Sequence, residues 1–210
     1  MPLFSITTPA TFLVAAMCAQ PPATEVHVVG HVEEVAVDSQ ISLGQLREMS
    51  AASSRRGKHS PFGFYFSAVV DAVTVHIRND QQNVCSGPVI INVTLTLTQR
   101  LIEIGRELKN GNCQFGTFVQ HYRHHAEADA EIFHAYVGKI NKTLQDAPLP
   151  MMVGQLGAPG VGNENIARMI RAIMNPVLDD MTVAQTKAPD AVDSPAEIQE
   201  LTNACAGKPI

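Results

Sequence analysis

The chain has 210 residues, of which 45% are hydrophobic, so it is long enough to bury one core and cramped for two full domains. Its 15 Lys and Arg against 20 Asp and Glu give a formal net charge of −5, and no broad positive field attracts phosphates. We therefore expect no nucleic-acid partner, while a protein or peptide partner stays open. The one basic cluster, at residues 55–59, is expected in a solvated loop rather than at an anion site.

The N-terminus is typical of an export signal. Residues 11–19 (TFLVAAMCA) form a short apolar run with small residues at Ala16 and Ala19, which predicts cleavage after residue 19 or 20. Met17 stands where the cleavage pattern wants a small residue, and no Lys or Arg precedes the run, so a buried or disordered N-terminal strand is the alternative. The run is too short to span a bilayer. We expect a signal peptide over residues 1–20 and a periplasmic or secreted protein that is not transmembrane.

Four cysteines fit an oxidising compartment. Cys85 opens a predicted strand and Cys113 opens a predicted helix, so a disulfide between them would clamp helix to sheet. Cys205 would then be free, or paired with Cys18 if the signal is not removed. Reduced, buried thiols are the alternative.

The first half of the chain is rich in β-branched residues that alternate with polar ones. This period of two predicts strands over Val26–Val37, Phe64–Ile77 and Val89–Thr98. Leu101–Leu108 alternates in the same way and is predicted as a further strand after a short turn. Leu43–Met49 is predicted as a short helix.

After the turn residues 109–112 the period becomes helical and stays so to about Asp146, with Asn112 as the N-cap. Apolar residues then recur at steps of three and four, the pattern of a helix that lies across a sheet. The stripe consists of Phe115, Val119, Tyr122, Ala126, Phe133, Val137, Ile140 and Leu144.

The last third of the chain is predicted to be loop and helix. Residues 148–162 are rich in Gly and Pro and are expected to form a long surface loop. A helix over Glu164–Met181 should be kinked or broken at Pro176, which has no N–H to donate. Residues 194–197 (SPAE) are a capping box that opens a final helix. The predicted fold is a single α+β domain over residues 21–210, with an antiparallel sheet, one long packed helix and further C-terminal helices.

The long helix carries the candidate site. His121, His125 and Asp129 follow one another at steps of four, so all three project from one edge of the helix beside its apolar stripe. Two imidazoles at this spacing converge on one Zn²⁺, and a carboxylate one turn further on supplies a third ligand or orients a histidine. The sequence therefore predicts a zinc site at His121, His125 and Asp129.

A zinc hydrolase also needs a general base, usually the Glu after the first histidine in His-Glu-x-x-His. Here that position is Tyr122, whose phenol is a poor base at neutral pH and which belongs to the apolar stripe. Glu127 points to another face of the helix. The sequence therefore identifies no catalytic residue, and the missing Glu argues against hydrolysis by the His-Glu-x-x-His mechanism.

Four segments resemble a group of uncharacterised secreted alphaproteobacterial proteins that are similar to bacterial zinc-dependent protease-like (zincin-like) proteins. They are CSGPVIINVTLTL from Cys85, IEIGREL, NCQFGTFVQHYRHH from Asn112 and AVDSPAEIQELTNAC ending at Cys205. The resemblance implies an exported protein with a sheet and a zinc-binding helix, in which His121 and His125 take the two histidine positions. Tyr122 in place of Glu keeps the metal ligands and removes the residue that a peptidase needs.

The sequence leaves three functions open. The first is an exported, zincin-like metal-binding protein with weak or lost peptidase activity; if it is an enzyme, it is a zinc-dependent hydrolase. The second is a non-catalytic envelope protein that binds or scaffolds a partner and holds no metal, with both histidines on the flank of a core helix. An active hydrolase that takes its base from elsewhere in the chain is a third possibility.

Overall fold

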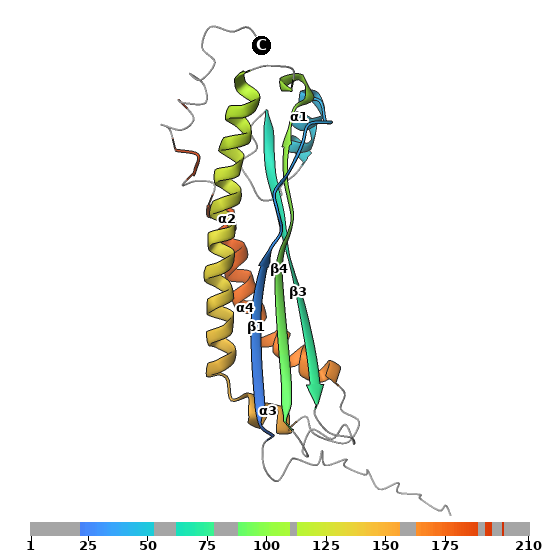
Figure 1. Cartoon of the computed structure of the whole chain (residues 1–210), viewed down its shortest axis with the longest axis vertical. Coiled ribbons are helices and arrows are strands. Elements are labelled where there is room, and N and C mark those ends of the chain that lie inside the picture. Colours follow the sequence, from blue (N-terminus) through green and yellow to red (C-terminus); the bar gives the residue numbers. More distant parts are fainter. Residues whose placement is uncertain are drawn as a thin grey trace, which may run out of the picture.

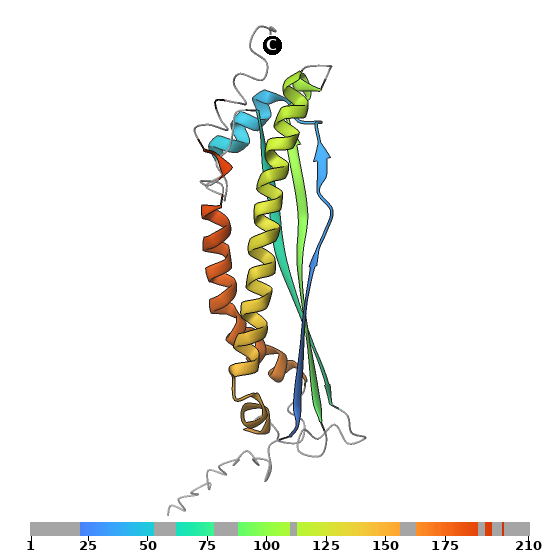
Figure 2. The same cartoon turned by 60° about the vertical axis from the view of Figure 1, so that its left-hand side comes forward.

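The computed structural model describes residues 22–52, 62–77, 88–109, 113–155, 163–188, 192–194 and 199. Figures 1 and 2 show an elongated molecule in which one twisted sheet is flanked along one face by helices α2 and α4. The elements in chain order are β1 (Thr24–Val32), β2 (Ala36–Asp38), α1 (Leu43–Ala52), β3 (Gly63–Ile77), β4 (Val89–Ile104), the 3-10 helix η2 (Arg106–Leu108), α2 (Cys113–Asp146), α3 (Leu149–Gln155) and α4 (Asn163–Lys187).

The sheet is mixed, so the predicted antiparallel sheet was wrong. The central strand β4 pairs with β3 in the antiparallel sense, but β1 and β2 both run parallel to β4. Thr24 faces Val89 and Ala36 faces Leu101, the same offset in both pairs, so β1 and β2 are two parts of one interrupted edge strand. Alternation in a sequence shows which residues share a face of the sheet. It carries no information about the direction in which a distant strand pairs.

The two strands predicted over Val89–Thr98 and Leu101–Leu108 are one strand with a bulge, which ends at Ile104. Gln99 adopts the left-handed conformation with a φ of 54°, and the register with β3 shifts between Phe66 and Ala68. Before the bulge the odd-numbered residues of β4 are buried, whereas Arg100 and Ile102 are buried after it. A β-bulge re-aims the side chains that follow it, and this one turns Arg100 toward α2.

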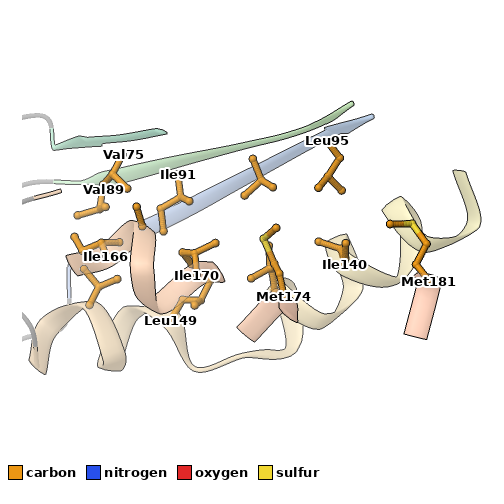
Figure 3. Close-up of a cluster of buried hydrophobic side chains, with 14 of the residues drawn as sticks. Val75, Val89, Ile91, Leu95, Ile140, Leu149, Ile166, Ile170, Met174 and Met181 are labelled. Atoms are coloured by element: carbon orange, nitrogen blue, oxygen red, sulfur yellow. The ribbon is translucent and has the colours of Figure 1, made fainter. Parts of the chain in front are cut away.

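The long predicted helix is confirmed as α2, and its apolar stripe packs on the sheet. With 16 residues in β4 and 34 in α2, both elements are about 50 Å long at about 3.3 Å and about 1.5 Å per residue. Figure 3 shows the core between the layers. In it the sheet residues Val75, Val89, Ile91 and Leu95 meet Ile140 of α2, Leu149 of α3, and Ile166, Ile170, Met174 and Met181 of α4.

Gly30 allows β1 to lie close to α2. A Cβ atom at this position would stand 2.8 Å from a methyl carbon of Val137 and 3.2 Å from the ring of Phe133. Contacts below 3.0 Å force neighbouring atoms to move, and close-packed interiors resist such movement. The sheet-to-helix spacing at this point therefore depends on a residue without a side chain.

The C-terminal third differs from the prediction in two places. Residues 149–155, predicted as part of a surface loop, form α3. Helix α4 continues past Met181 to Lys187, and of the predicted kink or break at Pro176 it shows no break; Figures 1 and 2 show that its axis bends along its length. Pro176 lies on the exposed side of α4, where water can satisfy the carbonyl that its missing N–H leaves unbonded. The buried Met174 and Met181 hold the helix on the sheet on both sides of the proline.

Several predictions fall outside the described residues. These are the signal peptide, the basic cluster at residues 55–59 and all but Ser194 of the predicted capping box. The disulfide hypothesis also stays a prediction, because Cys18, Cys85 and Cys205 lie outside the described residues and only the backbone of Cys113 is described.

Candidate metal centre

His121 and His125 approach each other on one edge of α2, as their spacing predicts. Their Nε2 atoms are 3.1 Å apart. The carboxylate of Asp193, which follows α4, completes the group: its Oδ1 lies 3.3 Å from Nε2 of His121 and 3.1 Å from Nε2 of His125. In the part of the chain that the structure describes, these three residues form the group that could hold a metal ion.

The group is shielded from solvent. The side chains of His121, His125 and Asp193 are 6%, 9% and 12% exposed. The two imidazole rings meet edge to face, with centroids 4.7 Å apart and planes at 88°. Tyr122 borders both rings, with centroids 5.1 Å from His121 and 5.9 Å from His125. Burial of this kind reduces the competition of water for a bound ion.

The size of the triangle fits a small divalent ion. Four ligands that surround Zn²⁺ tetrahedrally at about 2.0–2.1 Å are about 3.3–3.4 Å from one another, and an octahedral ion at a similar bond length brings neighbouring ligands to about 3.0 Å. The three measured edges, 3.1, 3.1 and 3.3 Å, lie between these values. The donor atoms are therefore already spaced as the ligands of one first-row transition metal.

Hydrogen bonds among the three atoms of this group do not match their donors and acceptors well. A neutral imidazole has one N–H and one acceptor nitrogen, and a carboxylate only accepts. If both Nε2 atoms carry a proton, both donate to Asp193 and their N–H groups crowd each other. If one carries a proton, that proton is shared between two acceptors. A cation among the three atoms removes this conflict, because all three then act as electron-pair donors.

Asp129 is not a member of this group. Its Oδ2 accepts from the hydroxyls of Tyr65 at 3.0 Å and Ser67 at 2.6 Å, and its Oδ1 accepts from the Gln185 amide at 2.6 Å. It therefore joins β3, α2 and α4, one helical turn from His125. Burial, and then the neighbouring Asp129 carboxylate, raise the pKa of Tyr65 to about 12, so that this phenol stays a donor.

Arg100 supplies the positive charge of this buried polar network. Its guanidinium donates to the carbonyls of Glu33 at 2.7 Å and Ala126 at 2.6 Å, and to the Tyr65 hydroxyl at 3.3 Å. The carboxylate of Glu33 accepts from the backbone N–H of Gln99 at 3.1 Å and from the Thr98 hydroxyl. The bulge in β4 and the break between β1 and β2 therefore face each other and together place Arg100 beneath α2.

Tyr122 is a core residue with a bonded hydroxyl. It is 2% exposed and donates to the carbonyl of Gly63 at 2.5 Å. Glu127 and His124 are exposed, as their positions on the helix predict. The geometry therefore gives Tyr122 a packing role in the place where a zincin has its base.

Sequence reasoning missed Asp193. It lies 68 residues after His125, and no periodicity or spacing connects a helix to a carboxylate at such a distance. The residues that follow it in the sequence, 194–197 (SPAE), predict only the N-terminal cap of a helix. The packing of α4 on α2 decides which carboxylate reaches the histidines.

Comparison of the chain with protein-family models, with characterised proteins and with solved structures gives no match. Within the described residues, none of the helices is both long and apolar enough to cross a membrane.

Proposed function

We propose that this protein binds a transition-metal ion, Zn²⁺ by preference, through His121, His125 and Asp193, and that it lacks zincin-type peptidase activity. The observation that carries the proposal is the buried triangle of two imidazole nitrogens and one carboxylate oxygen with edges of 3.1–3.3 Å. Asp193 replaces Asp129 as the carboxylate ligand.

The donor set favours particular ions. Zn²⁺ is bound by histidine nitrogen and carboxylate oxygen at short distances, and Co²⁺, Ni²⁺ and Fe²⁺ accept the same ligands. Ca²⁺ takes six to eight oxygen ligands and Mg²⁺ an octahedron of oxygens. Two imidazoles in a group of three donors therefore favour Zn²⁺ over the alkaline-earth ions.

The loss of peptidase activity follows from Tyr122. Hydrolysis by a zinc-bound water needs a base within hydrogen-bond reach of that water. Tyr122 is buried and its hydroxyl donates to Gly63, while the Asp193 carboxylate is used as a ligand. We expect no chelator-sensitive cleavage of a mixed peptide library.

Export is part of the same proposal, since it rests on the apolar run at residues 11–19. Fractionation of cells that express the full chain should find a protein outside the cytoplasm whose mass corresponds to cleavage after residue 19 or 20. A full-length protein in the cytoplasm would remove this part of the proposal and leave the metal site intact.

A second function is favoured by a specific observation. Contacts of 3.1 and 3.3 Å between imidazole and carboxylate are also hydrogen-bond distances, and a metal-free protein could use Asp193 simply to hold α2. In that case the face of the sheet away from the helices, with the exposed Val29, Phe66 and Val70, is the surface on which an envelope protein would bind a partner.

Metal analysis separates the two functions. Protein purified without a histidine tag, dialysed and loaded with Zn²⁺ should hold about one ion per chain. His121→Ala and His125→Ala should each weaken Zn²⁺ binding at least about tenfold, because each removes one of three ligands. His124→Ala, on the exposed side of the same helix, is the matched control and should bind as the wild type does. Wild-type protein that takes up no Zn²⁺ overturns the metal proposal and favours the metal-free function.

A further inference from the structure

Strand β3 is an edge strand with unused backbone hydrogen-bonding groups. In the described part of the chain it pairs with β4 alone. The Glu33 N–H donates to the Leu97 carbonyl, and the Val89 N–H donates to the Ala23 carbonyl, so the odd-numbered residues of β4 direct their backbone groups toward β1. Because alternate residues of a strand bond to opposite sides, the even-numbered residues of β4 bond to β3.

The register of β3 identifies the groups on its free edge. Asp71, Val73 and Val75 lie opposite odd-numbered residues of β4, which bond to β1, so their own N–H and C=O groups point away from the sheet. Residues 69–77 contain no Lys or Pro, which often protect an edge, and the Asp71 carboxylate is bonded to Arg171 at 2.9 Å. Such an edge is a template for a further strand.

The start of α4 forms a shelf beside this edge. In Figure 1 the first turns of α4, coloured orange, cross behind the lower end of β3 and emerge beyond its free edge. A groove of about 510 Å³ lies between the two elements, and Val73 and Val75 of β3 and Ala167 and Arg168 of α4 line it. Val75 and Ala167 are buried, so the floor of the groove is apolar. The groove has the place that the next strand of the sheet would take.

The charges at the groove leave one cation available. Arg171 donates from its Nε to Asp71, which neutralises its charge locally. Arg168 is exposed and makes no hydrogen bond or ion pair with the described residues. Glu164, an acidic residue that lines the groove, is exposed and likewise makes no ion pair within the described part of the chain. Arg168 can therefore pair with an acidic side chain of a molecule in the groove.

A second copy of the chain fits this position poorly. Two β3 strands side by side in an antiparallel pair would be related by a two-fold axis perpendicular to the sheet, which places both helix layers on the same face. Each α4 already extends past its own edge (Figure 1), so the two helices would compete for the same space. A single extended segment has no helix layer of its own and fits the groove without this conflict.

We propose that the free edge of β3 and the start of α4 bind an extended peptide segment, which adds to the sheet as a strand. The outward backbone groups of Asp71, Val73 and Val75 bond to the peptide backbone. Small or aliphatic side chains at alternate positions of the peptide pack on Ala167, and an acidic side chain pairs with Arg168. This binding site is separate from the metal site on α2 and does not depend on the proposed function.

Blocked decapeptides that alternate Val and Thr, with Glu, Gln or Lys at one central position, test the groove against the full chain. The Glu peptide should bind about threefold to fivefold more tightly than the Gln peptide, as expected for one exposed ion pair, and the Lys peptide should bind most weakly. Arg168→Gln should abolish the preference for Glu, whereas Arg123→Gln, at an exposed arginine of α2, should keep it. Fluorescence anisotropy of labelled peptides measures each Kd.

N-methylated forms of the Glu peptide test the strand pairing. Methyl groups on one alternate set of its backbone nitrogens should weaken binding at least about tenfold, because they remove the donors that face β3. Methyl groups on the other set should leave the Kd unchanged. In amide exchange measured by NMR, a peptide concentration of about 100 Kd should slow exchange at Asp71, Val73 and Val75 at least about tenfold.

The outcomes distinguish the possible occupants. If no peptide binds, or if the two methylated forms bind equally well, strand addition at β3 is wrong. If Arg168→Gln keeps the preference for Glu, the assignment of Arg168 to an acidic side chain is wrong. If the amides of Val73 and Val75 are protected without peptide, to a degree that rises with protein concentration, a second copy occupies the edge and the proposal is overturned. Circular dichroism checks that each variant is folded.

Discussion

The contact between α2 and the sheet differs on the two sides of the bulge at Gln99. At the apolar end, β4 residues Val89–Leu97 meet α2 residues from Phe133 onward in a core of aliphatic and aromatic side chains. At the polar end, Arg100 and three residues of α2, His121, His125 and Asp129, carry charges and imidazoles toward the interior, beside a smaller apolar cluster that contains Ile102 and Tyr122. The same helix and strand therefore serve as a scaffold at one end and hold the candidate site at the other.

The two ends of the interface between α2 and the sheet therefore have different roles. Apolar burial is non-directional, and it holds α2 in place without specifying a chemistry. The buried polar groups at the other end need particular partners, because each unpaired one costs free energy. A rigid apolar end therefore allows the polar end to position ligands on a helix that does not shift.

The largest expected effect is at the apolar end. Phe133→Ala removes a fully buried ring that also lies against Gly30, and the free energy of unfolding should fall by about 3–5 kcal/mol. Urea unfolding followed by circular dichroism measures it, with the exposed neighbour His134→Ala as control. A loss below about 1 kcal/mol would mean that this end is not the scaffold.

A smaller effect is expected at the polar end. Asp129→Ala leaves the donors of Tyr65, Ser67 and Gln185 without their acceptor, which should cost about 1–3 kcal/mol. Asp179→Ala, at an exposed position of α4, is the control. The folded variant should still bind Zn²⁺, since Asp129 is not in the ligand group. If the variant is folded and no longer binds Zn²⁺, the hydrogen bonds of Asp129 are also needed to position the metal ligands His121, His125 and Asp193.

The smallest effect concerns Glu103, near the end of β4. Burial, and then the carboxylate of Asp38, raise the pKa of Glu103, and its Oε2 has no hydrogen-bond partner among the residues that the structure describes. A raised pKa means that the folded state binds the proton more tightly than the unfolded state, so stability falls as pH rises from about 4.5 through the raised pKa. Glu103→Gln should flatten this decline by less than about 1 kcal/mol. Urea unfolding of both proteins at several pH values measures this decline. If the free energy of unfolding of Glu103→Gln falls with pH as steeply as that of the wild type, other groups cause the decline.

Local patterns predicted the elements well where one face of an element is buried. The apolar stripe from Phe115 to Leu144 predicted α2 because a helix packed on a sheet needs that period. The alternation in Phe64–Ile77 predicted β3 for the corresponding reason. The prediction failed at residues 149–155, where packing on the sheet outweighs local propensity.

The candidate site was predictable only in part. His121 and His125 lie on the same helix four residues apart, so helical geometry alone brings their imidazoles together. The carboxylate partner could not be chosen in this way. Asp129 has the right spacing, but Tyr65, Ser67 and Gln185 surround it in the folded chain and take both of its oxygens.

By itself, the sequence determined the elements, the buried stripe of α2 and the histidine pair, because each depends on residues within a few turns of one another. The tertiary structure decided the parallel pairing of β1 with β4, the inward turn of Arg100 at the Gln99 bulge, and the arrival of Asp193 beside His121 and His125. These features join residues that are many positions apart. Their physical cause is the packing of the helix layer on the sheet, and the periodicity of a local stretch of sequence carries no information about that packing.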